Sequence, residues 1–226
     1  MDPFVLKRIN AARAERIAVV AVTDLGDGRH RAVRENEDVP GPLGKAIEAA
    51  LRDGTARTVA VEGTEFFLNP HIPPPRLVVI GAVHITQSLA PMARMAGFDV
   101  LVIDPRGAFA TPERFRDTEL VAEWPDEVLA ERPLDRHTAL AAITHDPKID
   151  DGPLLAALHA ECFYVGALGS QKTHGTRRAR LLEAGATDAM LDKVDAPIGL
   201  DIGAATPPEI AVAILGSLVR ARRSPR

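Results

Sequence analysis

Residues 76–104 read RLVVIGAVHITQSLAPMARMAGFDVLVID, and this stretch decides the fold. It opens with the short apolar run 76–81, which ends in glycine, and it closes with a second apolar run at 99–104. Between them, residues 86–96 repeat apolar side chains at helical spacing. Two apolar strands joined by a helix indicate a parallel sheet that is buried on both faces.

The same alternation continues to the end of the chain. We expect a basic helix after Gly169, and a last helix that opens with the capping box Thr206-Pro-Pro-Glu209. The sequence predicts an α/β fold in which residues 76–226 form a Rossmann-like parallel sheet with helices on both faces. The remaining predicted strands are 137–144, 163–169 and 197–203, and the remaining predicted helices are 152–160 and 207–222.

A smaller segment of mixed type comes first. Residues 1–69 predict an α+β domain, and the proline-rich residues 70–75 predict an extended connector, because consecutive prolines cannot continue a helix. The expected elements of the small domain are a helix at 3–14, a strand at 16–24, a second strand that could pair back after the Gly26–Gly28 turn, a helix at 42–54 and a hairpin at 57–69.

Composition limits the function. The chain has 226 residues with 46% hydrophobic and 26% charged residues, which is typical of a folded globular protein. A net charge of -4 provides no overall basic field, so we expect neither nucleic acid nor a membrane surface as a partner. The single cysteine, Cys162, excludes a disulfide framework and a multi-cysteine zinc site. A reducing compartment and the lack of an apolar leader predict a cytoplasmic location.

The turn after the first parallel strand is a candidate nucleotide site. Gly81 and His84 lie where a dinucleotide fold holds phosphate at a helix N-terminus, and Asp104 ends the next strand, where a ribose-binding acid belongs. Val83 stands at the second glycine position of that motif. The turn therefore has three interpretations: a dinucleotide site, a site for a smaller anion, or a structural turn without a ligand.

Gly169, Ser170 and Lys172 form a second candidate site. A strand that ends in Gly-Ser and enters a basic helix offers backbone N–H groups, a hydroxyl and an ammonium to a phosphate. The alternative is a solvated basic helix face.

Polar residues follow two more strands. His145 and Asp146 end the third parallel strand, where His145 is either an acid, base or ligand, or a structural hydrogen-bonding group. Asp201 lies between Gly199 and Gly203 and is either a carboxylate for a cation or a polar ring, or a turn cap.

Together these pieces resemble the XdhC/CoxI family of xanthine dehydrogenase accessory proteins. The resemblance covers most of residues 67–222 and is carried by GALGSQKTH (166–174), THDPKID (144–150) and PIGLDIGAATPPEIAVAIL (197–215). It implies a Rossmann-like C-terminal domain and a role in molybdoenzyme maturation, in which molybdenum cofactor is bound and passed to a molybdenum hydroxylase such as xanthine dehydrogenase. It also implies a cysteine desulfurase as a further partner and a homodimer.

The sequence departs from the family pattern in two places. The family loop reads Gly-Ala-Gly-His, and here Val83 precedes His84. Fuller members carry a Gly-Gly-Cys motif in an N-terminal domain, whereas residues 1–70 contain no cysteine, so the chain resembles a divergent member with a short N-terminal domain. We expect a non-catalytic cofactor-insertion chaperone. The alternatives are an NAD(P)-dependent oxidoreductase, with Asp104 on the ribose and His145 as proton donor, and a partner-binding scaffold without a ligand.

Overall fold

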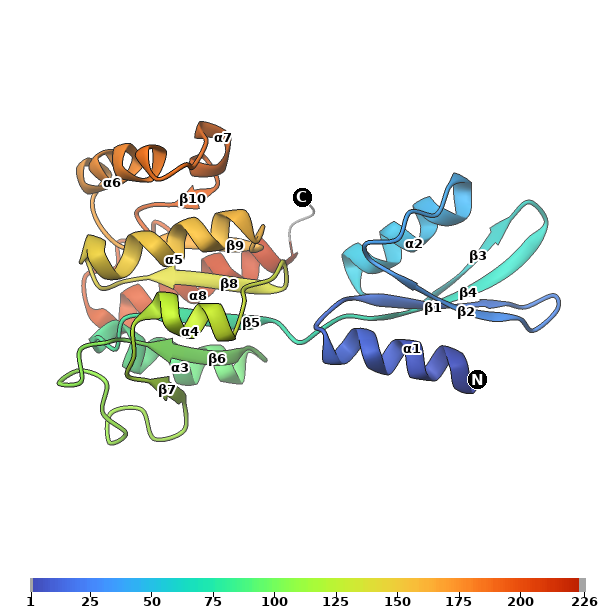
Figure 1. Ribbon diagram of the computed structural model, residues 1–226, viewed down its shortest axis with the longest axis horizontal. Helices are drawn as coiled ribbons and strands as arrows, with labels where there is room; N and C mark the ends of the chain where they lie inside the picture. Colours follow the sequence, from blue (N-terminus) through green and yellow to red (C-terminus); the bar gives the residue numbers. More distant parts are fainter. Residues whose placement is uncertain (1, 224–226) are drawn as a thin grey trace. The chain divides into compact units, whose positions relative to one another are not determined.

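A computed structural model describes residues 2–223 of the chain. The chain divides between Pro73 and Pro74 into two compact units, which Figure 1 shows in blue to cyan and in green to red. Each unit has its own sheet and its own core.

The first unit is a four-stranded antiparallel sheet in the order β2-β1-β4-β3 with two helices. Along β1, Val19 and Ala21 pack under α1, and Val20 and Val22 pack under α2. Because successive strand residues point to opposite faces, the two helices cover opposite faces of this sheet. The elements are α1 (Pro3–Ala14), β1 (Val19–Asp24), β2 (His30–Arg34), α2 (Gly41–Asp53), β3 (Arg57–Val61) and β4 (Thr64–His71).

The second unit contains a six-stranded parallel sheet in the order β10-β9-β8-β5-β6-β7. Counted from β5, this is the strand order of a Rossmann fold, and the order reverses between β5 and β8. Ligands in such sheets bind beyond the carboxyl ends of the strands at that reversal. The strands are β5 (Arg76–Ile80), β6 (Asp99–Ile103), β7 (Glu119–Val121), β8 (Thr138–Ala142), β9 (Tyr164–Ala167) and β10 (Val194–Asp195).

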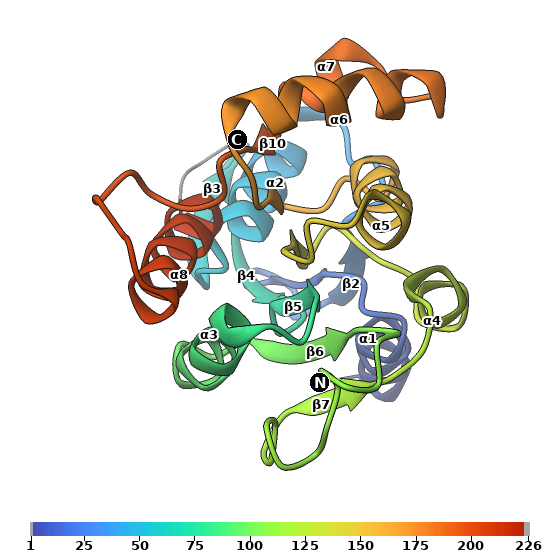
Figure 2. The same cartoon turned by 90° about the vertical axis from the view of Figure 1, so that its left-hand side faces the viewer.

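Helices cover both faces of the parallel sheet. Leu77 and Val79 of β5 belong to the core under α3 and α8, and Val78 and Ile80 belong to the core under the other helices. Figure 2 shows α3 and α8 on one side of the sheet and α4 and α5 on the other. The helices are α3 (His84–Met95), α4 (Pro125–Glu131), α5 (Pro147–His159), α6 (Gln171–Glu183), α7 (Asp188–Leu191) and α8 (Pro207–Arg223). The predicted Rossmann-like fold is confirmed.

Several predicted boundaries are wrong. Residues 197–203 are not a strand, because β10 ends at Asp195 and a loop then leads to α8. Helix α5 begins at Pro147 instead of residue 152, since the Asp146 side chain caps it there. The predicted connector starts too early, because residues 70 and 71 are the end of β4. Strand β7 and helices α4 and α7 were not predicted from the sequence.

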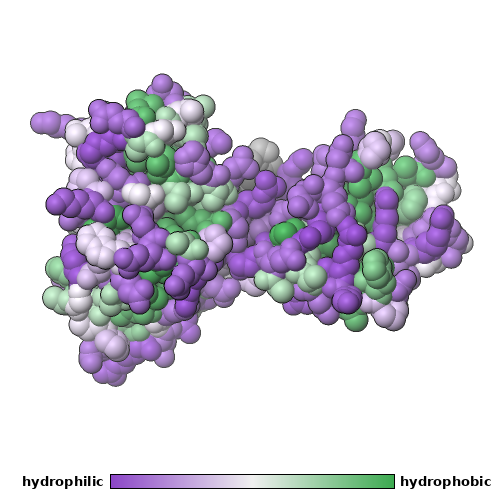
Figure 3. Space-filling model, in the orientation of Figure 1, coloured by the Kyte–Doolittle hydropathy of each residue, from purple (hydrophilic) through white to green (hydrophobic). Residues whose placement is uncertain are grey.

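No helix among residues 2–223 is long and apolar enough to cross a membrane. The face of the molecule in Figure 3 is mostly hydrophilic, with hydrophobic residues in small areas between hydrophilic ones.

Candidate functional site

The loops that follow the parallel strands meet at one edge of the second unit, which faces the viewer in Figure 2. The backbone N–H of Gly81 donates to Ile103 O at 2.8 Å, and the N–H of Ile143 donates to Ile80 O at 2.9 Å. The N–H of Leu168 donates to Ala142 O at 2.8 Å. The loops after β5, β6, β8 and β9 are therefore neighbours, as the parallel sheet requires.

Gly81 is needed for the close contact of two of these loops. Its φ is 122°, and a Cβ placed on it would lie 2.9 Å from Cγ2 of Thr144. Any other residue would be strained at this positive φ, and its Cβ would collide with Thr144 in the loop after β8. The glycine is thus explained by packing. Val83 is the N-cap residue of α3 without a side-chain cap, and His84 is exposed in the first turn of that helix.

The carboxylate of Asp104 is completely buried and is hydrogen-bonded within the fold. Its Oδ1 accepts from the backbone N–H and Nε of Arg106, at 3.0 and 2.9 Å. Its Oδ2 accepts from Arg106 Nη2 and from the N–H of Ala82, both at 2.8 Å. These four hydrogen bonds fill the accepting positions of a carboxylate. Burial alone would raise the pKa of Asp104, but the hydrogen bonds from Arg106 and Ala82 outweigh it and lower that pKa.

The loop after β8 is organised around a second buried carboxylate, Asp150. Asp150 Oδ1 accepts from the Thr144 hydroxyl at 2.7 Å, and its Oδ2 accepts from the N–H of His145 at 3.1 Å. These bonds hold His145 at a φ of 66°, with its ring exposed. Asp146 accepts from the N–H of Lys148 at 3.0 Å and so caps α5. The Asp146 carboxylate therefore serves as the N-cap of α5.

The loop after β9 turns into α6 at Gly169 and Ser170. Gly169 has a φ of 131°, and Ser170 caps the helix by accepting from the N–H of Thr173 at 3.2 Å. The capping hydroxyl satisfies one of the amide groups that a helix start leaves without a partner. Lys172 follows in the first turn and is exposed.

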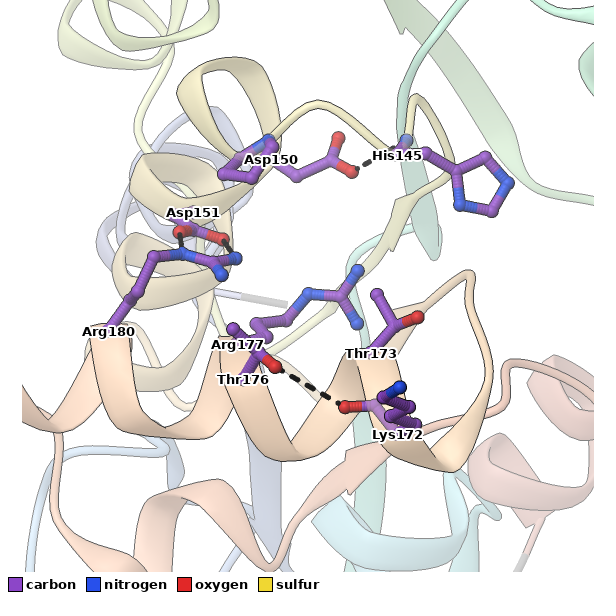
Figure 4. A pocket seen from close by; sticks show the side chains of 9 residues that line it. His145, Asp150, Asp151, Lys172, Thr173, Thr176, Arg177 and Arg180 are labelled. Atoms are coloured by element: carbon purple, nitrogen blue, oxygen red, sulfur yellow. Dashed lines mark hydrogen bonds and ion pairs between the residues drawn. The ribbon is translucent and has the colours of Figure 1, made fainter.

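A cavity of about 250 Å³ lies between the first turns of α5 and α6. Figure 4 shows its charged side chains arranged around an open centre. Arg180 on its rim is paired with Asp151, with nitrogen-to-oxygen distances of 2.6 and 3.1 Å. The cavity is lined by His145, Pro147, Asp150, Asp151, Lys172, Thr173, Thr176, Arg177 and Arg180.

Arg177 is the most unusual of these residues. Only 3% of its surface is exposed, and its Nη2 donates to Leu168 O at 2.8 Å. Its Nε and Nη1 are buried and have no acceptor among the described residues. Burial lowers the pKa of this guanidinium, although Asp150 and Asp151 act in the opposite direction. A buried cation with unused donors is costly, and an anion that accepted hydrogen bonds from those donors would reduce that cost.

The structure separates the predicted site residues into groups. His145 and Lys172 line the cavity, with Asp146, Gly169 and Ser170 forming the adjoining helix starts. Gly81 and Asp104 lie in the loops after β5 and β6, His84 begins α3, and Asp201 is exposed in the loop before α8. Sequence reasoning missed Asp150 and Arg177 as site residues. Asp150 ends the THDPKID motif, so the sequence analysis included this residue in the motif but assigned it no role in the site.

A family model described as the XdhC Rossmann domain matches residues 77–218. The chain belongs to this family. The matched residues span the parallel sheet from β5 to α8 and include both sides of the α5–α6 cavity. The predicted family resemblance is confirmed.

Two relatives are named for xanthine dehydrogenase and for molybdenum cofactor insertion. The chain is 29% identical over 214 residues to a probable subunit of xanthine dehydrogenase from Bacillus subtilis (strain 168), covering 91% of this chain and 61% of the relative. It is 27% identical over 147 residues to the molybdenum cofactor insertion chaperone PaoD of Escherichia coli (strain K12), covering 65% of this chain and 40% of that protein. The chain thus spans less than two thirds of either relative.

A solved structure has the same fold. A protein from Bacillus halodurans described as a xanthine dehydrogenase superposes with a TM-score of 0.67 at 25% identity. The match covers 96% of this chain and 66% of that protein.

Among residues 2–223, no three His, Cys, Asp or Glu side chains are grouped to hold a metal ion.

Proposed function

We propose that this chain is an accessory protein of molybdoenzyme maturation that binds molybdenum cofactor and delivers it to a molybdenum hydroxylase of the xanthine dehydrogenase type. Membership of the XdhC family and the names of two relatives support this proposal. The structural observation that carries it is the buried guanidinium of Arg177, whose unused donors adjoin a cavity at the ligand-binding edge of the sheet.

The residues at this edge fit the phosphate end of the cofactor. Molybdenum cofactor has a phosphate, a polar fused ring and a dithiolene. A cavity of about 250 Å³ is smaller than most pockets for whole ligands, so it suits the phosphate, and the ring would lie outside over the sheet edge. Arg177 and Lys172 supply positive charge, and the start of α6 supplies backbone N–H groups.

The protein offers no thiol to the cargo at this edge. Cys162, the single cysteine of the chain, is buried just before β9, at the amino end of that strand. The ligand-binding edge lies at the carboxyl end. In this proposal the chain would hold and orient its cargo through charge and hydrogen bonds, and the cofactor itself would supply the sulfur chemistry.

Native mass spectrometry of the chain co-expressed with a molybdenum hydroxylase and a cofactor source tests the proposal. We expect the wild-type chain to carry the mass of molybdopterin and to form a complex with the hydroxylase. Arg177→Gln should lose the cofactor. Arg178→Gln is the matched control, because Arg178 lies on the same helix but pairs with Asp188 and Asp192 outside the cavity. A wild-type chain that never retains molybdopterin contradicts the proposal.

An NAD(P)-dependent oxidoreductase is the second candidate, and the Rossmann strand order favours it. The four hydrogen bonds on Asp104 count against it, because a ribose would have to displace Arg106 to reach that carboxylate. Calorimetric titration with NAD(H) and NADP(H) separates the two functions. Low-micromolar binding would favour the oxidoreductase.

The homodimer, the cysteine desulfurase partner and the cytoplasmic location stay predictions. Light scattering of the purified chain tests the first, and co-purification with a desulfurase tests the second. Fractionation of cells that express the full-length protein tests the third.

A further inference from the structure

The cavity between α5 and α6 contains two buried charges of opposite sign that do not meet. Asp150 is 1% exposed and Arg177 is 3% exposed, and both line the cavity. Neither side chain forms an ion pair within residues 2–223. Figure 4 shows the Asp150 carboxylate directed toward His145 and the Arg177 guanidinium extending from α6 on the opposite side. A ligand group between them would face a donor on one side and an acceptor on the other.

The remaining charges favour an anion. Arg180 is neutralised by Asp151, so Lys172 and Arg177 leave a positive excess over Asp150. Asp150 is nevertheless an obstacle, because a fully ionised ligand would approach a carboxylate in a poorly solvated site. Burial raises the pKa of Asp150 to about 6, with Arg177 acting in the opposite direction. The other charged groups near it are Arg106 from the loop after β6, Asp126 of α4 against Gly152, and its chain neighbours Asp146 and Asp151.

We propose that this cavity selects a phosphate monoester together with one proton, which Asp150 shares with a phosphate oxygen, and that it discriminates against sulfate. The proposal deepens the proposed function, on which it rests only for the identity of the natural phosphate. In the complex, one P–O–H group and the Asp150 carboxylate are joined by the proton, and the other phosphate oxygens accept from Arg177 and Lys172. No covalent bond forms or breaks, and the proton comes from solvent.

The chemistry of the two anions explains the selectivity. A phosphate monoester has a second pKa near 6, so it takes up a proton at little cost near neutral pH. Sulfate is the anion of a strong acid and has no proton to share. Asp150 therefore accepts a hydrogen bond from a protonated phosphate. Beside sulfate it either stays ionised and repels the anion, or takes up the proton itself and donates to a much weaker acceptor, although the two anions have similar size and shape.

Isothermal titration calorimetry of the full chain tests this with methyl phosphate and sodium sulfate as probes. At about pH 8 both probes are dianions, and we expect methyl phosphate to bind at least about tenfold more tightly than sulfate. Repeating the titration in two buffers with different ionisation enthalpies should show an uptake of about one proton with methyl phosphate.

Two variants test whether the selectivity for phosphate and the proton uptake depend on the Asp150 carboxylate. Asp150→Asn should bring the ratio of the two affinities close to one and abolish most of the proton uptake. Asp151→Asn is the matched control, because this neighbouring carboxylate is already held by Arg180, and it should keep the wild-type ratio. If Asp150→Asn does not fold, the selectivity and proton uptake of the wild-type chain still decide the question.

Two outcomes overturn the inference. One is equal affinity of the wild-type chain for the two probes, and the other is phosphate binding without proton uptake. Its failure is distinguishable from that of the proposed function. A chain that retains molybdopterin without selecting phosphate over sulfate loses only this inference, and a chain that selects phosphate but never carries molybdopterin loses only the proposed function.

Discussion

Arg106 donates three hydrogen bonds to the buried carboxylate of Asp104, from its backbone N–H, Nε and Nη2. The fourth comes from Ala82 in the loop after β5. The bond from Ala82 joins the ends of the neighbouring strands β5 and β6, and the cluster occupies the carboxylate that a dinucleotide fold reserves for a ribose.

Asp104→Asn should lower the free energy of unfolding of the second unit by about 3 kcal/mol, because the amide replaces an acceptor by a donor that faces other donors. Fluorescence of Trp124, the single tryptophan of the chain, reports urea unfolding of this unit. Since the pKa of Asp104 is lowered in the fold, its contribution is present above about pH 4 and is lost as the pH falls through the folded value. Wild type and variant should therefore converge in acid.

Asp27→Asn is the control for this prediction. Asp27 pairs with Arg29 two residues away, as Asp104 does with Arg106, but on the exposed surface. Because Asp27 lies in the first unit, far-UV circular dichroism follows the urea unfolding of this variant, whose free energy of unfolding should change little. A loss as small for Asp104→Asn as for Asp27→Asn would contradict the structural role of the buried pair.

Gly81→Ala should lower the free energy of unfolding by about 3 kcal/mol, because it combines backbone strain at positive φ with overpacking against Thr144. Gly107→Ala is a control in the same unit, since a Cβ there meets no atom within 4 Å. Urea denaturation followed by Trp124 fluorescence compares the two. Equal stability of both variants would disprove the close approach of the loops after β5 and β8.

Asp150 should make the free energy of unfolding depend on pH in the opposite sense to Asp104. Its folded pKa of about 6 lies above the unfolded value, so the fold binds an extra proton between these values, and stability is lost as the pH rises from about 4 to about 6. A shift of this size corresponds to about 3 kcal/mol. Asp150→Asn should remove this decrease, as urea titrations at several pH values will show. A difference in stability between wild type and Asp150→Asn that stays constant over that range would refute the prediction.

Arg177→Met should leave the free energy of unfolding within about 1 kcal/mol of wild type, while methyl phosphate binding falls at least about tenfold. The substitution removes a hydrogen bond to Leu168 O, but it also removes a buried charge with two unused nitrogens. Combined urea denaturation and calorimetry measure both effects. A stability loss well above about 2 kcal/mol together with unchanged methyl phosphate binding would show that Arg177 serves the fold alone.

The sequence predicts the parallel core well because its strands are buried on both faces. The runs that became β5, β6 and β8 are continuously apolar and leave no ambiguity of face. Strand β7 has only three residues, Glu119–Val121, too few for a pattern. Residues 197–203 looked like a strand by composition, yet they turn away toward α8, which only the packing of that helix decides.

The site was harder to predict because equivalent residues differ only in their partners. Asp104 and Asp150 are both buried carboxylates near strand ends, yet only Asp104 is followed by an arginine that reaches it. Arg177 and Arg178 look alike in a basic stretch, but the rotation of α6 turns Arg177 inward and leaves Arg178 on the surface with Asp188. Such differences depend on tertiary contacts that no local pattern contains.

The reversal of strand order between β5 and β8 divides the sheet into two halves with different tasks. In the half that runs from β5 to β7, the polar groups of the strand ends satisfy one another and lock the loops together. In the half that begins with β8, Arg177 and Asp150 form no ion pair with each other. A scaffold divided in this way keeps its rigidity on one side and its binding chemistry on the other, so either can change by mutation without the other.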